Sequence, residues 1–213
     1  MLFNSTEFLI FFPIIFLLLL VIRGRLRWLL PLGASYYFYM SWRAEYIILI
    51  LLSTFVDYII SALIYRTGHP LRRKLYLFVS LFINLGILFY FKYLMFFTDS
   101  LNEALRLIGA DGRIQVAALI LPVGISFYTF QTLSYTIDVY RGKVVPEKNP
   151  IVFALFVSYF PQLVAGPIER SKDLLPQLHA LPHKSLLHAP QIAEGLRLIA
   201  QKSSGSRPFS PLC

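Results

Sequence analysis

The chain has 213 residues, of which 57% are hydrophobic and 15% are charged, and its mean hydropathy is +0.64. This composition is typical of a membrane protein and excludes an ordinary soluble domain. The net charge of +9 falls in short loops between apolar runs, so it indicates membrane topology rather than nucleic-acid binding. Cys213 is the only cysteine, which excludes an internal disulfide and a cysteine-based metal cluster.

Successive apolar runs predict an all-α membrane protein, a multi-span bundle of about six membrane helices or half-helices with short interfacial helices. The runs are 8–22, 28–40, 46–65, 75–97, 116–140 and 151–164. Phe8–Ile22 lacks a following A-x-A-like cleavage site, so we expect a retained helix rather than a signal peptide. The run 28–40 is short and contains Pro31 and Gly33, which predicts a tilted, broken or partly inserted helix.

A short interfacial helix is predicted after the fourth run. Ser100 and Glu103 have the spacing of a capping box, and the apolar residues that follow form one stripe that Gly109 ends. The helix would therefore begin anew at Ser100.

Lysine and arginine placement predicts the orientation of the chain. The loops 23–27, 66–74 and 141–148 are basic, whereas 98–115 is slightly acidic. If 28–40 crosses the bilayer, two crossings separate each basic loop from the next. All three loops can then be cytoplasmic, with the N-terminus outside.

Polar residues crowd the segment 119–170, which is otherwise apolar enough for a membrane. The polar residues of its first half are Ser126, Tyr128, Thr129, Gln131, Thr132, Ser134, Tyr135, Thr136 and Asp138. Because an unpaired polar group in hydrocarbon costs several kcal/mol, this segment should face protein or a water-filled cavity. The pattern indicates a protein that handles a substrate inside the bilayer.

Two carboxylates within apolar runs need separate interpretations. Asp57 is a functional candidate because burying a charge in a membrane is costly, but pairing with a basic residue or protonation would also explain it. Asp138 precedes Arg141 by three residues, so an ion pair at the helix end is as good an account as a substrate contact. Gln131 and Tyr135 share a helix face that suits a tunnel wall or interhelical hydrogen bonding.

No catalytic base or metal site is predicted from residue spacing. Three of the four histidines, His179, His183 and His188, follow Arg170 among prolines that should break any helix aligning them. The fourth, His69, lies in a basic loop. The chain also lacks nucleophile-elbow, zinc-helix and phosphate-loop motifs.

Several long motifs resemble the N-terminal half of membrane-bound O-acyltransferases, in the branch that acetylates bacterial polysaccharides such as alginate. The motifs are the opening MLFNSTEFLIFF, LGASYYFYMSW at 32–42, LPVGISFYTFQTLSYTIDVYRG at 121–142 and FPQLVAGPIERSKDLLPQL at 160–178. The resemblance covers about residues 1–199. The related D-alanyl transfer proteins of Gram-positive walls are the near alternative.

The resemblance implies a multi-pass enzyme of the bacterial inner membrane. Such proteins transfer an acyl group, from acetyl-CoA or a carrier-linked acetyl donor, toward an extracytoplasmic polysaccharide or a partner acetyltransferase, with no bound cofactor. A buried histidine in a tunnel is the expected general base, and it lies in the half that does not match this chain. Tunnel-wall or framework candidates are Gln131, Tyr135, Asp138, Arg141, Gln162, Gly166, Pro167, Glu169 and Arg170.

The end of the chain departs from the family pattern. The helical stripe at 189–199 gives way to AQKSSGSRPFSPLC at 200–213, a polar tail that we expect to be disordered. A frameshift or premature stop is our hypothesis, and a natural short form is the alternative. A half-bundle would expose polar faces, so we expect the chain expressed alone to be unstable and inactive.

Two other classes of function remain open. A transporter or channel subunit would also place polar residues in the membrane, although the sequence shows no inverted repeat. A non-catalytic subunit of a polysaccharide modification or secretion complex would need no base of its own. Donor-dependent acetyl labelling separates an acyltransferase from both.

Overall fold

The structure is a computed structural model that describes residues 6–41, 43–107, 122, 124–165 and 170–182. All regular structure within these residues is helical. The elements are α1 (Thr6–Val21), α2 (Leu26–Met40), the 3-10 turn η1 (Ala44–Tyr46), α3 (Ile47–Arg66), α4 (Pro70–Leu107), α5 (Ile125–Tyr140), α6 (Pro150–Ser158), α7 (Phe160–Ala165) and α8 (Ser171–Ala180). The all-α prediction is confirmed for the described part of the chain.

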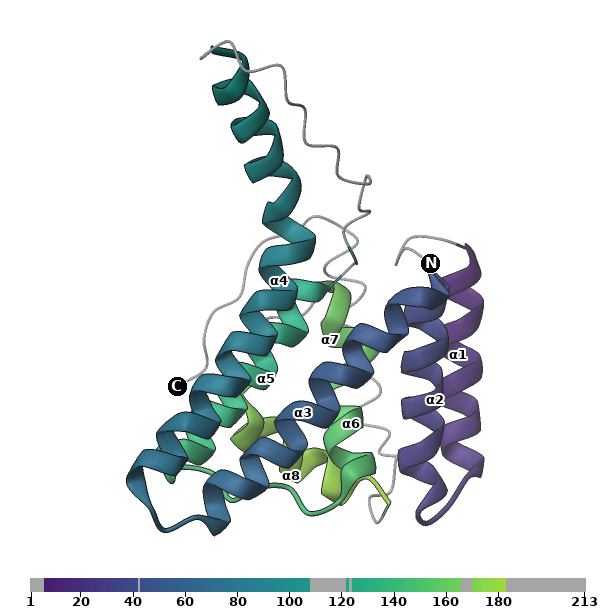
Figure 1. Ribbon diagram of the computed structural model, residues 1–213. Coiled ribbons are helices and arrows are strands. Elements are labelled where there is room, and N and C mark those ends of the chain that lie inside the picture. Colours follow the sequence, from purple (N-terminus) through teal and green to yellow (C-terminus); the bar gives the residue numbers. More distant parts are fainter. Residues whose placement is uncertain (1–5, 42, 108–121, 123, 166–169, 183–213) are drawn as a thin grey trace, which may run out of the picture. The chain divides into compact units, whose positions relative to one another are not determined.

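The helices bury polar side chains among apolar ones and leave large apolar side chains on the outside. The helices α3, α4 and α5 contact one another, while α2 packs on α1 and α6 (Figure 1). On α3, Asp57 is fully buried whereas Phe55 is 65% exposed. On α4, Asn84 is buried whereas Phe82 is 70% exposed. Because residues two apart lie on nearly opposite sides of a helix, the outer face is apolar, as in a protein surrounded by lipid.

Within the described residues, two helical stretches are long and apolar enough to cross a membrane. They are Ala44–Arg66 and Pro70–Leu94. Two shorter apolar helices are Thr6–Val21 and Pro150–Gln162. The predicted runs 8–22, 28–40 and 46–65 each correspond to one helix. The last run instead forms two helices, α6 and α7, separated at Tyr159.

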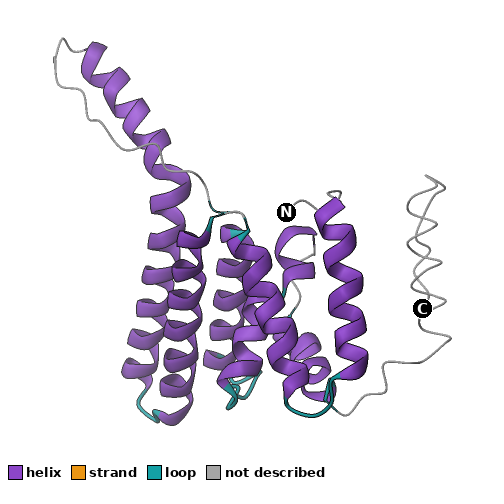
Figure 2. Cartoon of the chain, turned by 90° about the vertical axis from the view of Figure 1, so that its right-hand side faces the viewer, coloured by secondary structure: helices purple, strands orange, loops and turns teal. Residues whose placement is uncertain are grey.

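The predicted interfacial helix at Ser100 is wrong, because α4 continues without a break from Pro70 to Leu107. Glu103 does not cap Ser100 but pairs with Arg106 three residues later, at 2.9 Å. Extending an existing helix by one residue is easier than nucleating a new one, so the capping pattern has no effect here. The final turns of α4 extend beyond the neighbouring helices (Figures 1 and 2).

A short helix, α8, follows Arg170 and ends at Ala180, so of the three histidines after Arg170 it contains His179 alone. Pro176 lies inside α8, whose Leu174, Leu175 and Leu178 are buried. Burial of three leucines on one face offsets the single hydrogen bond that Pro176 cannot donate. The predicted stripe at 189–199 and the predicted polar tail at 200–213 lie outside the described residues.

The three basic loops lie at the same end of the bundle. The α1–α2, α3–α4 and α5–α6 connections lie together at the bottom in Figures 1 and 2. Arg73 joins two of them, since its guanidinium donates to the carbonyl of Tyr140 at 2.6 Å and lies 5.4 Å from the centre of that ring. In the described part of the chain, α2 and α3 lie between the first two basic loops, and α4 and α5 lie between the second and the third.

Candidate functional site

The break between α6 and α7 leaves backbone groups that a continuous helix would pair. Pro161 has no N–H group and cannot continue the helical ladder. The N–H of Phe160, which would bond the carbonyl of Phe156 in a regular helix, instead donates to Ser35 Oγ on α2 at 3.2 Å. Ser35 in turn donates to the carbonyl of Pro31 at 2.7 Å.

Gln131 on α5 supplies the donor that the carbonyl of Phe156 has lost. Its Nε2 lies 2.8 Å from that oxygen and 3.4 Å from Oε1 of Gln162 on α7. Both glutamines are buried. A broken helix is tolerated at membrane depth when neighbouring side chains satisfy its freed groups, so α2 and α5 together stabilise the break.

A second polar cluster surrounds Asp57, where α3, α4 and α5 meet. Its Oδ2 accepts from Asn84 Nδ2 at 2.9 Å, and its Oδ1 accepts from the hydroxyls of Ser80 and, at 3.3 Å, Thr136. Asn84 Oδ1 accepts from Ser53 at 2.6 Å. Among the described residues the partners of Asp57 are hydroxyl and amide groups rather than a lysine or arginine. The cluster joins three helices, and Asp57 is fully buried.

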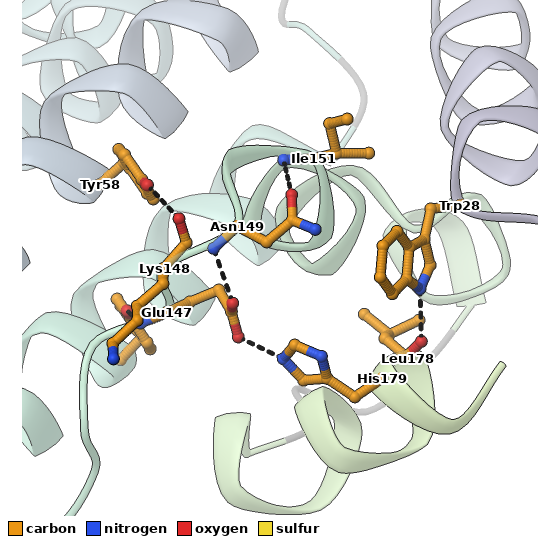
Figure 3. A network of polar contacts seen from close by, with 9 residues as sticks. Trp28, Tyr58, Glu147, Lys148, Asn149, Ile151, Leu178 and His179 are labelled. Carbon is orange, nitrogen blue, oxygen red and sulfur yellow. Dashed lines mark hydrogen bonds and ion pairs between the residues drawn. The ribbon is translucent and has the colours of Figure 1, made fainter. Parts of the chain in front are cut away.

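A third polar network fixes the basic end of the bundle (Figure 3). The hydroxyl of Tyr135 accepts from the N–H of Glu147 at 2.8 Å. Glu147 Oε1 accepts from the N–H of Asn149, whose side chain caps α6 by accepting from the N–H of Ile151 at 3.0 Å. Glu147 Oε2 lies 2.6 Å from Nε2 of His179 on α8. The α5–α6 loop is thus held from α5 and from α8.

Two further hydrogen bonds complete this end. Trp28 Nε1 donates to the carbonyl of Leu178 at 2.8 Å, which ties α2 to α8 (Figure 3). The hydroxyl of Tyr58 donates to the carbonyl of Lys148 at 2.7 Å, which ties α3 to the same loop. The carbonyl of Leu178, in the last turn of α8, also accepts from the N–H of Leu181 at 3.3 Å, whereas Lys148 lies in the α5–α6 loop.

The structure brings only part of the predicted site together. Gln131 and Gln162 meet, whereas Tyr135 belongs to the network at the basic end.

The remaining candidates do not join these contacts in the described part of the chain. Asp138 is half-buried and forms no ion pair there with the exposed Arg141. Arg170 is exposed at the start of α8. Gly166, Pro167 and Glu169 lie outside the described residues.

Neither of the histidines that the structure describes lies at a buried polar cluster. His69 is exposed, and His179 is half-exposed at the basic end. His183 and His188 lie outside the described residues. Among the residues that the structure describes, no three His, Cys, Asp or Glu side chains lie close enough together to hold a metal ion. The clusters can position helices and satisfy a broken backbone.

Sequence reasoning missed Ser35, Glu147 and His179 as structural partners. For Ser35 the available signal was Pro161 inside an apolar run, because a break in a helix frees backbone groups that need polar partners. The sequence did not reveal which side chain would serve.

Comparison with known proteins shows which proteins the chain is similar to. The chain is 42% identical over 185 residues to the probable alginate O-acetylase AlgI of Pseudomonas aeruginosa, covering 86% of this chain and 35% of that protein. It is 43% identical over 187 residues to the corresponding protein of Pseudomonas putida, covering 86% of this chain and 38% of that protein. A peptidoglycan O-acetyltransferase of Helicobacter pylori is 32% identical over 168 residues, covering 68% of this chain and 31% of that protein.

No protein-family model matches the chain, and no solved structure matches it. Over the matched residues the chain is homologous to these O-acetylating proteins, which confirms the resemblance of its motifs to the membrane-bound O-acyltransferases. Within that class it is a homologue of the alginate O-acetylases. The chain spans 35% to 38% of the length of the first two of these relatives.

Proposed function

We propose that this chain supplies part of a membrane-bound acyltransferase that transfers an acetyl group to a hydroxyl of an extracytoplasmic polysaccharide. The observation that carries the proposal is the 42% identity over 185 residues to an alginate O-acetylase. The buried polar clusters support it, because they preserve a broken helix and a polar interior that a simple anchor would not need.

The proposed role of the described residues is to position the reaction, not to perform the proton transfer. A hydroxyl must lose its proton as it attacks an acetyl carbonyl, which requires a base within hydrogen-bond reach. Gln131 and Ser35 hold the junction of α6 and α7 just before the candidates Gly166, Pro167 and Glu169. The base would come from elsewhere in the complete enzyme.

We place the chain in a bacterial inner membrane as a multi-pass protein of about six crossings or half-crossings, with the N-terminus outside. The shared end of the three basic loops and the apolar outer face support this placement. The acetyl donor, acetyl-CoA or a carrier-linked acetyl group, would approach from the basic, cytoplasmic end. An extracytoplasmic polysaccharide or a partner acetyltransferase would accept the group at the other end.

A chimera tests the proposal directly. In Pseudomonas aeruginosa, the matching residues of the alginate O-acetylase would be replaced by those of this chain, in a strain lacking the native gene. We expect acetyl groups to reappear on secreted alginate, measured by proton NMR. The matched control is the same chimera with Gln131→Leu, which should insert but acetylate less because the junction of α6 and α7 loses its donor.

A chimera that accumulates in the membrane without acetylating alginate would contradict the proposal. The Helicobacter pylori relative suggests peptidoglycan as a second acceptor. The corresponding chimera in that protein, scored by acetyl content of purified peptidoglycan, decides between the two polymers.

A further inference from the structure

An open apolar groove runs between α1 and α2. Its volume is about 440 Å³, within the usual range of ligand sites, roughly 300–1,000 Å³. The residues lining it are Phe11, Ile15, Ile22, Leu26, Leu29, Leu30, Gly33, Ala34 and Tyr37. A surface of this kind suits a hydrocarbon chain rather than a polar substrate.

Gly33 accounts for part of the space in this groove. A Cβ atom added at Gly33 would meet nothing within 4 Å, so the position faces open space. Helix interiors ordinarily favour alanine over glycine by about 1 kcal/mol. The groove can therefore be filled in a controlled way from this position.

Two arginines lie at one end of the groove. Ile22 and Leu26 line it there, and Arg23 and Arg25 are the exposed residues beside them. Neither guanidinium forms an ion pair or a hydrogen bond with another described residue. Arg27 differs, because it is buried and donates to the carbonyl of Ile22 at 2.7 Å.

We propose that this groove binds an anionic phospholipid, with an acyl chain along α1 and α2 and the phosphate at Arg23 and Arg25. Guanidinium groups form charge-assisted hydrogen bonds with phosphate, and basic pockets beside membrane helices bind anionic head groups. The inference requires the chain to lie in a membrane but does not depend on its acyltransferase activity. A lipid held here would fix the α1–α2 pair, since α1 has no buried residue of its own.

Native mass spectrometry of the full 213-residue chain in detergent tests the proposal. Phosphatidylglycerol and phosphatidylcholine with identical acyl chains would be titrated separately. We expect one phosphatidylglycerol to be retained on the order of tenfold more tightly than phosphatidylcholine, since each arginine contributes to binding of an anionic surface. The variant Arg23→Gln/Arg25→Gln should lose this preference, and Arg23→Lys/Arg25→Lys should keep most of it.

Two further variants separate the groove from general basicity. Arg66→Gln/Arg72→Gln removes two exposed arginines from another basic loop and should leave lipid retention unchanged. Gly33→Leu should reduce retention of both lipids by occupying the groove, and circular dichroism would verify its helical content. Equal retention of the two lipids, an unaffected Arg23→Gln/Arg25→Gln variant, or an equal loss in the control pair would each overturn the proposal.

Discussion

Gln131 and Phe156 are joined by a hydrogen bond of 2.8 Å from a side-chain amide on α5 to a backbone carbonyl on α6. The carbonyl is available because the N–H of Phe160 bonds Ser35 instead. All four of these residues are buried. The contact gives a structural reason for the buried glutamine on α5.

The variant Gln131→Leu should destabilise the chain by about 1–3 kcal/mol, because a buried carbonyl loses its partner. The thermal midpoint in detergent, followed by circular dichroism, should fall. Phe130→Leu, a neighbouring change on the exposed face of α5, is the control and should have little effect. Equal midpoints for the two variants would show that the carbonyl of Phe156 has another partner.

Asp57 and Ser80 should be energetically coupled. Removing either partner alone leaves a buried polar group short of a hydrogen bond, whereas removing both relieves part of that cost. A cycle of Asp57→Ala and Ser80→Ala should give a coupling energy of about 0.5–3 kcal/mol in equilibrium unfolding.

The control cycle pairs Asp57→Ala with Ser158→Ala. Ser158 is buried on α6 and donates to the carbonyl of Ala154 at 2.8 Å, so it has no bond to Asp57. These two changes should be additive within about 0.5 kcal/mol. Additivity in the Asp57 and Ser80 cycle as well would argue against a cooperative cluster.

Trp28 should stabilise the docking of α8. Trp28→Phe keeps an aromatic ring but removes the N–H that donates to Leu178, so local opening of α8 should become more frequent. Hydrogen exchange of the peptide covering 174–181 should accelerate by several-fold, whereas Tyr37→Phe on the exposed side of α2 should leave it unchanged. An unchanged exchange rate in Trp28→Phe would contradict this role.

The orientation of the basic end can be measured by cysteine labelling. In a Cys213→Ser background, Arg25→Cys, Gly68→Cys and Lys143→Cys each place one thiol in a different basic loop. All three should resist a membrane-impermeant maleimide in intact spheroplasts and react after lysis. Arg43→Cys, in the connection at the opposite end, should react in intact spheroplasts. Labelling of the three loops from outside would reverse the proposed orientation.

Helix positions were largely predictable, because they depend on local composition. The apolar runs at 8–22, 28–40 and 46–65 correspond closely to α1, α2 and α3. One prediction was wrong because it followed a local pattern that a stronger interaction outweighed. Glu103 pairs forward with Arg106 instead of capping Ser100, and α4 continues through this position.

The candidate site was predictable in composition but not in arrangement. Gln131 and Gln162 were both tunnel-wall or framework candidates, and they meet. Tyr135, one turn from Gln131 on the same helix, instead contacts the backbone of Glu147. One helix face can therefore serve two unrelated contacts, which spacing along that helix does not reveal.

The sequence by itself determined that this protein is helical, has an apolar exterior and carries its basic loops in alternate connections, because these properties follow from residue type and order. The tertiary structure alone decided that Asp57 is surrounded by Ser80, Asn84 and Thr136, and that Ser35 and Gln131 satisfy the broken helix. Those contacts join residues far apart in the chain, and they depend on how each helix is rotated and positioned against the next. Buried polar groups must find partners, but only the packing of the helices determines which partners they find.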